Sequence, residues 1–240
     1  SWHTACTLHG LATAQAALGD YARAIETAQR GIQLSEEVGV SRFVAMGLET
    51  LGTIYQDLGR YAEAEATHSR AIQLMMRQEW AFWQPRLLAN LALDRLRAGD
   101  LNVGNMLREA LELGVSSGQI AHAVRALEAL AEFHVVRREP EVALAYATQL
   151  SQIAKLGEMR QMQGSAQYWR GEALLLLGMH EEAASALATA LACITATGHR
   201  LLLRAIYAAQ ARAYEGLGRM KEAEAARAAA EGVRVVMPGR

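Results

Sequence analysis

Cysteine and proline are scarce in this 240-residue chain, which has two of the first and three of the second. Cys6 and Cys193 lie far apart in the sequence. We therefore expect no disulfide between them and a reducing compartment, the cytoplasm. Few prolines, with much alanine and leucine among the 52% of hydrophobic residues, are typical of a helical protein.

A surplus of one charge is also missing, because 24 Lys and Arg residues balance 25 Asp and Glu residues. Without a basic excess to neutralise phosphates, we expect no binding to nucleic acid. Apolar runs stay shorter than the roughly 18–20 residues that span a bilayer, so we expect no membrane insertion. The chain begins Ser1-Trp2, without a methionine or a signal peptide. This start indicates a fragment of a larger protein.

Motifs that would hold a cofactor, a metal or a catalytic centre are absent from the sequence. It has no phosphate-binding glycine loop and no His-Glu-x-x-His. The seven histidines are scattered, without cysteines or carboxylates at metal-ligand spacing. We therefore expect no catalytic residues, no cofactor, no metal and no enzyme activity.

What the chain does contain is one short turn, repeated six times. Counted from its glycine or the equivalent residue, the turn falls at positions 19, 59, 99, 138, 178 and 218, in steps of 40, 40, 39, 40 and 40 residues. Arg138 stands in the fourth copy where the others have glycine. A fixed period of this size is typical of stacked repeats. Leu48, Leu51 and Tyr55 precede the second turn at helical spacing, so each repeat is predicted to be helix, turn, helix.

A second break is expected where a glycine follows the second helix, at Gly39, Gly114, Gly157 and Gly198. The breaks divide a single solenoid domain, residues 1–240, into six repeats. The predicted repeats are residues 2–38, 41–78, 84–116, 119–156, 160–197 and 199–236.

Small residues recur at fixed distances from the turns. Seven residues before them stand Ala12, Gly52, Ala92, Ala131, Gly171 and Ala211. Five residues after them stand Ala24, Ala64, Ala143, Ala183 and Ala223, with Val103 in the third repeat. Helices approach closely only where side chains are small. Gly171→Leu or Ala64→Leu should therefore destabilise by a few kcal/mol, on the order of 1–3, through overpacking, whereas Glu49→Leu should have little effect.

This arrangement resembles the tetratricopeptide repeat. The resemblance lies in Leu51, Gly52 and Tyr55 of the first helix, in the Gly-Asp/Arg-Tyr turns at residues 19–21 and 59–61, and in alanines of the second helix. The period near 40 exceeds the family's usual 34, and the usual closing proline is absent. Such long units are similar to arrays in bacterial signalling ATPases, transcriptional activators and kinesin-light-chain-like proteins. A HEAT or armadillo solenoid, with repeats of 40–47 residues, is the competing interpretation.

The resemblance implies an all-α, right-handed superhelix of about six helix pairs, whose first helices line a concave groove. The mixed charged, amide and aromatic residues expected to face this groove are Glu49, Gln56, Arg86, Asn90, Arg125, Glu128, Glu132, Trp169, Glu172 and Arg212. Trp80 and Trp83 are either an aromatic plug between two repeats or an exposed hot spot for a partner. The lysine and asparagine set of the chaperone-tail clamp is missing, so that partner is not assigned.

Three functions agree with this architecture. The first is a protein-interaction scaffold that holds a peptide, a partner protein or another domain of the parent chain in the groove. The second is a sensing arm that binds a small inducer for an attached ATPase or regulator, in a groove that includes Trp169. The third is self-association through the final helix, predicted over residues 222–236, because it lacks an obviously polar outer face.

Overall fold

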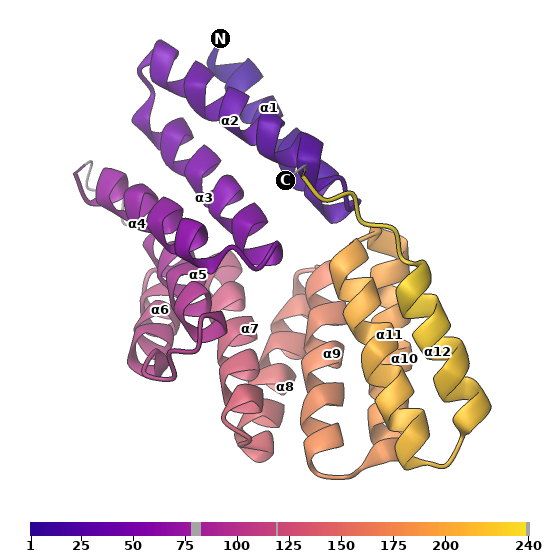
Figure 1. Ribbon diagram of the computed structural model, residues 1–240. Coiled ribbons are helices and arrows are strands. Elements are labelled where there is room, and N and C mark those ends of the chain that lie inside the picture. Colours follow the sequence, from indigo (N-terminus) through magenta and orange to yellow (C-terminus); the bar gives the residue numbers. More distant parts are fainter. Residues whose placement is uncertain (78–82, 119, 239–240) are drawn as a thin grey trace. The chain divides into compact units, whose positions relative to one another are not determined.

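The computed structural model of the chain describes residues 1–77, 83–118 and 120–238. Within these ranges the chain forms twelve α-helices, which alternate with short turns and match the predicted helix pairs (Figure 1). The helices are α1 (Trp2–Ala17), α2 (Tyr21–Val38), α3 (Ser41–Asp57), α4 (Tyr61–Arg77), α5 (Gln84–Arg97), α6 (Gly104–Ser116), α7 (Ile120–Val136), α8 (Pro140–Leu156), α9 (Arg160–Leu176), α10 (His180–Thr197), α11 (Arg200–Gly216) and α12 (Met220–Gly232).

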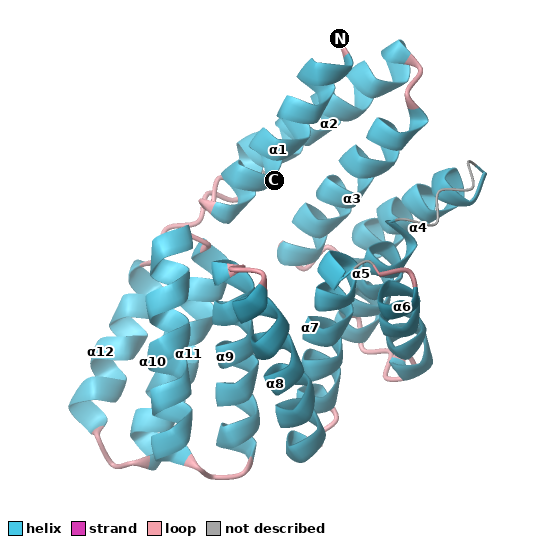
Figure 2. Ribbon diagram, turned by 180° about the vertical axis from the view of Figure 1, so that it is seen from behind, coloured by secondary structure: helices cyan, strands magenta, loops and turns pink. Residues whose placement is uncertain are grey.

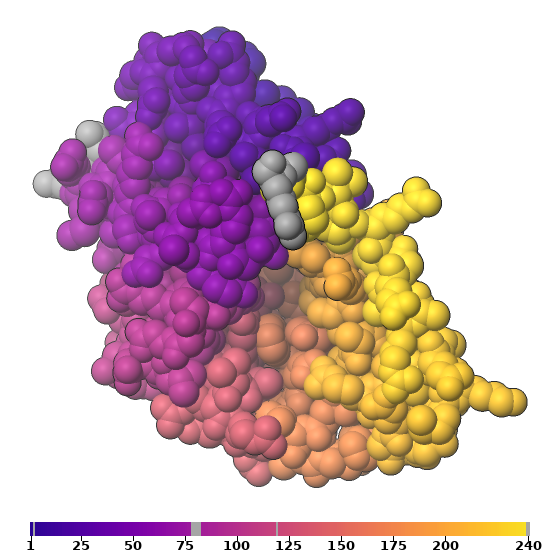
Figure 3. All heavy atoms as spheres, viewed as in Figure 1, coloured from indigo at the N-terminus to yellow at the C-terminus, as the bar shows by residue number. Residues whose placement is uncertain are grey.

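The chain divides into two compact units, and the division falls within α7. Unit 1 comprises Ser1–Ala126 with Val235–Arg240, and unit 2 comprises Leu127–Arg234. In unit 1, helices that follow one another pack together, and the first helices α1, α3 and α5 also contact each other in that order (Figure 2). In unit 2, α9 contacts α11 in the same way. Side chains fill the spaces that separate the ribbons of α1, α2 and α3 (Figure 3).

The first turn of every repeat contains one residue with a left-handed backbone, at the six predicted positions. These residues are Gly19, Gly59, Gly99, Arg138, Gly178 and Gly218, with φ between 60° and 104°. Glycine adopts this conformation without steric cost, and it ends the preceding helix. Arg138 adopts it at φ 60° despite its side chain, so the period of the fold is kept even where the sequence motif is lost.

One of the four predicted second breaks is wrong in position. Gly39, Gly157 and Gly198 directly follow α2, α8 and α10, as predicted. After α8 the left-handed residue is Glu158, one position beyond the glycine. Gly114 lies inside α6, and the turn that follows has its left-handed residue at Gly118. A Cβ at Gly114 would lie 2.9 Å from the backbone N and Cα of Ala123. This glycine therefore permits close packing of α6 on α7 rather than a turn.

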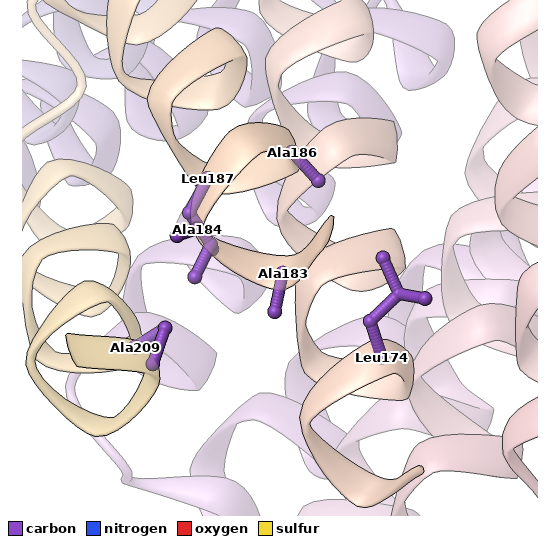
Figure 4. Close-up of a cluster of buried hydrophobic side chains, with 7 residues drawn as sticks. Leu174, Ala183, Ala184, Ala186, Leu187 and Ala209 are labelled. Carbon is purple, nitrogen blue, oxygen red and sulfur yellow. The ribbon is translucent and has the colours of Figure 1, made fainter. Parts of the chain in front are cut away.

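The predicted small residues lie where helices pack. The six small residues that stand seven positions before the turns are all buried. The six residues that stand five positions after the turns, including Val103, are buried as well. In unit 2, side chains from α9, α10 and α11 meet around Ala183, Ala184 and Leu187 (Figure 4). A Cβ at Gly171 would lie 2.6 Å from the Leu187 side chain, which supports the predicted cost of enlarging that residue.

The final helix is shorter than predicted, because α12 ends at Gly232 rather than at residue 236. Glycine and the β-branched Val233, Val235 and Val236 are poor helix formers. Val236, which belongs to unit 1, instead donates its N–H to the carbonyl of Gly19 at 2.6 Å and accepts the N–H of Tyr21 at 3.0 Å.

Candidate functional site

Five of the residues predicted to line a groove lie together in unit 1. Glu49 and Gln56 come from α3, Arg86 and Asn90 from α5, and Arg125 from α7. They join His68 of α4 and Asp94 of α5 in one continuous set of hydrogen bonds and ion pairs. We call these seven residues the polar network.

One end of the polar network is an ion pair between successive first helices. The Arg86 Nε donates to Glu49 Oε1 at 2.7 Å, and the Asn90 side-chain amide donates to the same oxygen at 3.1 Å. Burial alone would raise the pKa of Glu49. The charge and hydrogen bond of Arg86, with smaller contributions from His68 and Arg125, hold that pKa below its ordinary value instead. Glu49 is therefore a buried carboxylate that Arg86 keeps ionised.

The middle of the polar network connects three first helices through amides. Arg125 donates through Nε to the Asn90 side-chain oxygen at 2.7 Å and through a terminal nitrogen to the Gln56 oxygen at 3.0 Å. The Gln56 amide nitrogen donates to the backbone carbonyl of Asn90 at 3.1 Å and to Asp94 Oδ1 at 2.6 Å. Both polar atoms of each side-chain amide are thus engaged within unit 1.

The other end is a pair of completely buried residues, His68 and Asp94, with 0% exposure each. The His68 Nδ1 lies 2.6 Å from Asp94 Oδ2. The His68 ring fits against α3 only because residue 52 is glycine, since a Cβ there would lie 2.5 Å from its Nε2. This Nε2 has no hydrogen-bond partner among the described residues.

Sequence reasoning did not single out His68 and Asp94, although the repeat register contains a signal for them. In the fifth repeat Leu187 packs on Gly171 as His68 packs on Gly52. Positions equivalent to Asp94 hold the buried apolar residues Ile54 and Phe133. A polar pair at two positions that are apolar in other repeats could have been found by aligning the six copies.

The residues at the centre of the polar network, predicted to face a groove, are buried. Glu49 is 8% exposed, Gln56 2% and Asn90 0%. They are buried because the polar side chains of neighbouring first helices point at one another and satisfy each other. The structure leads us to expect that Glu49→Leu destabilises the chain, in contrast to the expectation from the sequence, because it removes the acceptor that Arg86 and Asn90 share.

Beside the polar network lies a pocket of about 250 Å³, part of which is open to solvent. It lies between α3, the end of α4 and the start of α5. Apolar side chains form most of its wall, and Glu49 belongs to both the wall and the network. We call it the Met–Trp pocket. Its lining residues are Arg42, Ala45, Met46, Glu49, Met75, Trp83 and Leu87.

Trp83 is half-buried in the wall of this pocket. Its ring centroid lies 5.0 Å from that of His122, in an edge-to-face arrangement. Burial, and to a lesser extent the charge of Arg86, lower the pKa of His122. Trp83 thus packs partly within unit 1 and partly along the pocket, and its role as a hot spot for a partner stays a prediction. Trp80 lies outside the described residues.

The remaining predicted groove residues, Glu128, Glu132, Trp169, Glu172 and Arg212, lie in unit 2. Arg212 forms an ion pair with the buried Glu172 of the preceding first helix. Tyr168 and Trp169 have ring centroids 4.8 Å apart. Burial and the neighbouring Glu172 charge raise the pKa of Tyr168. The Arg212–Glu172 ion pair thus joins the first helices α9 and α11, with the carboxylate buried and the arginine exposed.

Neither a metal site nor a membrane-spanning helix is found within the described residues. In the part of the chain that the structure describes, no three His, Cys, Asp or Glu residues are grouped so that they could hold a metal ion. Among the same residues, no helix is both long and apolar enough to cross a membrane.

Comparison with known proteins identifies the repeat type. Residues 48–74, which include Leu51, Gly52 and Tyr55, match the family model of the tetratricopeptide repeat. A search of curated proteins finds no match.

Two solved structures share the fold across almost the whole chain. BtubC (BKLC) from P. vanneervenii is 18% identical, with 95% of each chain covered and a TM-score of 0.62. A Rap protein complexed with Competence and Sporulation Factor is 14% identical, with 97% of this chain and 78% of the Rap chain covered and a TM-score of 0.69. At these identities the likeness concerns the fold alone.

Proposed function

We propose that this chain, which is built of tetratricopeptide-type helical repeats, holds a peptide or partner protein at the Met–Trp pocket of unit 1. Repeats of this type generally mediate interactions between proteins. The observation that carries the proposal is the pocket itself, an apolar recess beside a rigid set of buried polar contacts. The Rap protein complexed with Competence and Sporulation Factor is an example of this fold with a bound partner.

The size of the pocket favours a single side chain as its occupant. Pockets for drug-sized molecules enclose roughly 300–1,000 Å³. The Met–Trp pocket has about 250 Å³, including space open to solvent. Because that figure counts open solvent, the enclosed space is much smaller and suits at most one apolar side chain of a partner rather than an inducer molecule. In unit 1, a docking role is therefore better supported than small-molecule sensing.

The composition of the wall also favours docking. Met46 and Met75 are flexible and polarisable, which allows a wall to adapt to the side chain that it receives. Trp83 offers a large flat surface, and tryptophan is enriched among residues that dominate binding energy. The polar network fixes α3 against α5 behind this wall through Glu49, Arg86 and Asn90, so little ordering is required on binding.

Self-association through the final helix has less support. The exposed face of α12 carries Lys221, Glu224, Arg227 and Glu231, so the premise that it lacks a polar outer face is wrong. A polar outer face is typical of a terminal repeat that caps a stack. An oligomer through this helix remains a prediction.

The proposal predicts what a random-peptide display selection on the immobilised chain will yield. Selected peptides should share one bulky apolar residue, because that side chain fills the Met–Trp pocket. Ala45 lines the pocket and is 5% exposed, so Ala45→Leu should fill the recess and weaken binding of the selected peptides at least tenfold. Fluorescence anisotropy with labelled peptides measures this loss.

The matched control is Ala66→Leu, the same chemical change at an exposed position of α4. It should leave the affinity unchanged, and circular dichroism should show both variants folded. Peptides without a common apolar residue, or peptides that bind Ala45→Leu as tightly as the parent chain, would contradict docking at the pocket.

A further inference from the structure

Residues 235–238 follow the final helix and belong to unit 1, where they meet the turn between α1 and α2 (Figure 1). We call these residues the strap. Val236 of the strap pairs with Asp20 in parallel orientation, as residues of neighbouring β-strands do. Its N–H donates to the Gly19 carbonyl at 2.6 Å, and its carbonyl accepts the N–H of Tyr21 at 3.0 Å. The strap is therefore joined to this turn through main-chain groups.

The strap bonds to backbone groups that the helices leave without a partner. Tyr21 is the first residue of α2, and the first N–H groups of a helix have no acceptor within that helix. The Asp20 side chain accepts the N–H of Arg23 at 3.2 Å, and the Val236 carbonyl adds an acceptor for Tyr21. Tyr61 begins α4 in the same way, but among the described residues no backbone carbonyl accepts its N–H.

Tyr21 also connects α2 to α3. Its side chain is completely buried, and its hydroxyl donates to Asp57 Oδ2 at 3.2 Å. Burial, together with the neighbouring Asp57 charge, raises the pKa of Tyr21, so the hydroxyl keeps its proton. One residue therefore holds the strap through its backbone and α3 through its side chain.

The helix pair next to the strap buries little apolar surface. The helices α1 and α2 pack on each other and on α3. Among the side chains described in α1, those that are buried belong to Ala5, His9, Ala12 and Ala16. Because three of these are alanines and apolar stabilisation follows the area removed from water, α1 gains little from burial. We therefore expect this pair to open more easily than elements with larger buried side chains.

We propose that the strap holds the first helix pair closed against α3. With Val236 bonded, Tyr21 is fixed at its N–H and at its hydroxyl, and α2 cannot leave α3 without breaking both contacts. Each hydrogen bond alone contributes modestly, because it replaces one to water. Since the strap belongs to the same chain, its effective concentration at the turn is high, and the contact persists. Release of the strap frees α1 and α2 to open.

The restraint is separate from docking at the Met–Trp pocket, whose lining residues lie between Arg42 and Leu87. Failure of one proposal therefore leaves the other standing.

Hydrogen exchange of the Tyr21 amide, followed by NMR in the full chain, tests whether the strap is bound. Its protection factor should exceed that of Tyr61 by about tenfold or more, because only Tyr21 has the Val236 acceptor. Val236→Pro removes the N–H that donates to Gly19 and places the proline ring there instead. This change should lower the protection of Tyr21 to that of Tyr61. Exchange throughout α1 and α2 should become about threefold faster or more, while exchange in α9, α10 and α11 stays unchanged.

Val236→Ala is the matched control, since it keeps the backbone N–H and shortens a side chain that is 56% exposed. It should preserve the protection of Tyr21 and the exchange rates of α1 and α2. If Tyr21 keeps its protection in Val236→Pro, or has no more than Tyr61 in the parent chain, the strap is not bound as proposed. If Tyr21 loses protection in Val236→Pro while α1 and α2 exchange as before, the strap binds without holding the pair, and the proposal is overturned.

Discussion

Asp94→Ala should destabilise the chain by about 3 kcal/mol, because it removes the acceptor of a completely buried histidine and of a buried amide. Among the described residues Asp94 is the hydrogen-bond partner that His68 loses, whereas Gln56 keeps the backbone carbonyl of Asn90 as an acceptor. The large effect arises because neither His68 nor the space left by Asp94 can be reached by water. Urea denaturation followed by circular dichroism measures the loss.

The paired variant His68→Leu/Asp94→Ile is the informative control. It places at both positions the type of residue that other repeats already bury there, as Leu187 and Ile54 show. Replacing both partners of a buried polar pair by apolar groups is often close to neutral. We expect the double variant to lose less than half of what Asp94→Ala loses. A double variant less stable than the single one would contradict this role of the pair.

Gly114→Ala should destabilise the chain by about 1–3 kcal/mol, although alanine is the better helix former. The new methyl group would lie 2.9 Å from the backbone N and Cα of Ala123. Backbone atoms cannot rotate away as a side chain can, so α6 and α7 must separate. The midpoint of urea denaturation, compared with that of the parent chain, reports this change.

The control for Gly114 is Gly10, a glycine inside α1 with no atom within 4 Å of a Cβ placed on it. Gly10→Ala should stabilise the chain by about 0.5–1 kcal/mol through helix propensity alone. The same chemical change thus has opposite signs at the two positions. Equal effects at both would show that the contact between α6 and α7 is not as described.

The sequence was most informative where backbone geometry repeats. The six first turns could be predicted because each requires one left-handed residue, and the register identified even Arg138 without its glycine. Gly114 was misassigned for a related reason. A glycine in a sequence indicates either a left-handed turn or a close helix contact, and only the position of Ala123 distinguishes the two.

The site was less predictable, because it depends on which side chains of neighbouring helices face each other. Period and spacing grouped Glu49, Gln56 and Asn90 on neighbouring first helices, and the structure joins them in one polar network. Period and spacing could not show that Arg86 and Arg125 would cover these residues and bury them. The Met–Trp pocket needs Met75 from α4 beside Trp83 from the start of α5, an arrangement with no signal in the repeat pattern.

Docking of a partner side chain in the Met–Trp pocket is tested most directly by the methyl spectrum of the nine methionines. The measurement is a ¹³C-methyl NMR titration with the tightest peptide from the display selection. We predict that the signals of Met46 and Met75, which line the pocket, will shift. The signal of Met76, which follows Met75 on α4 and is 71% exposed, should not shift. Saturable binding that leaves Met46 and Met75 unchanged and moves other methionines would contradict docking at the pocket.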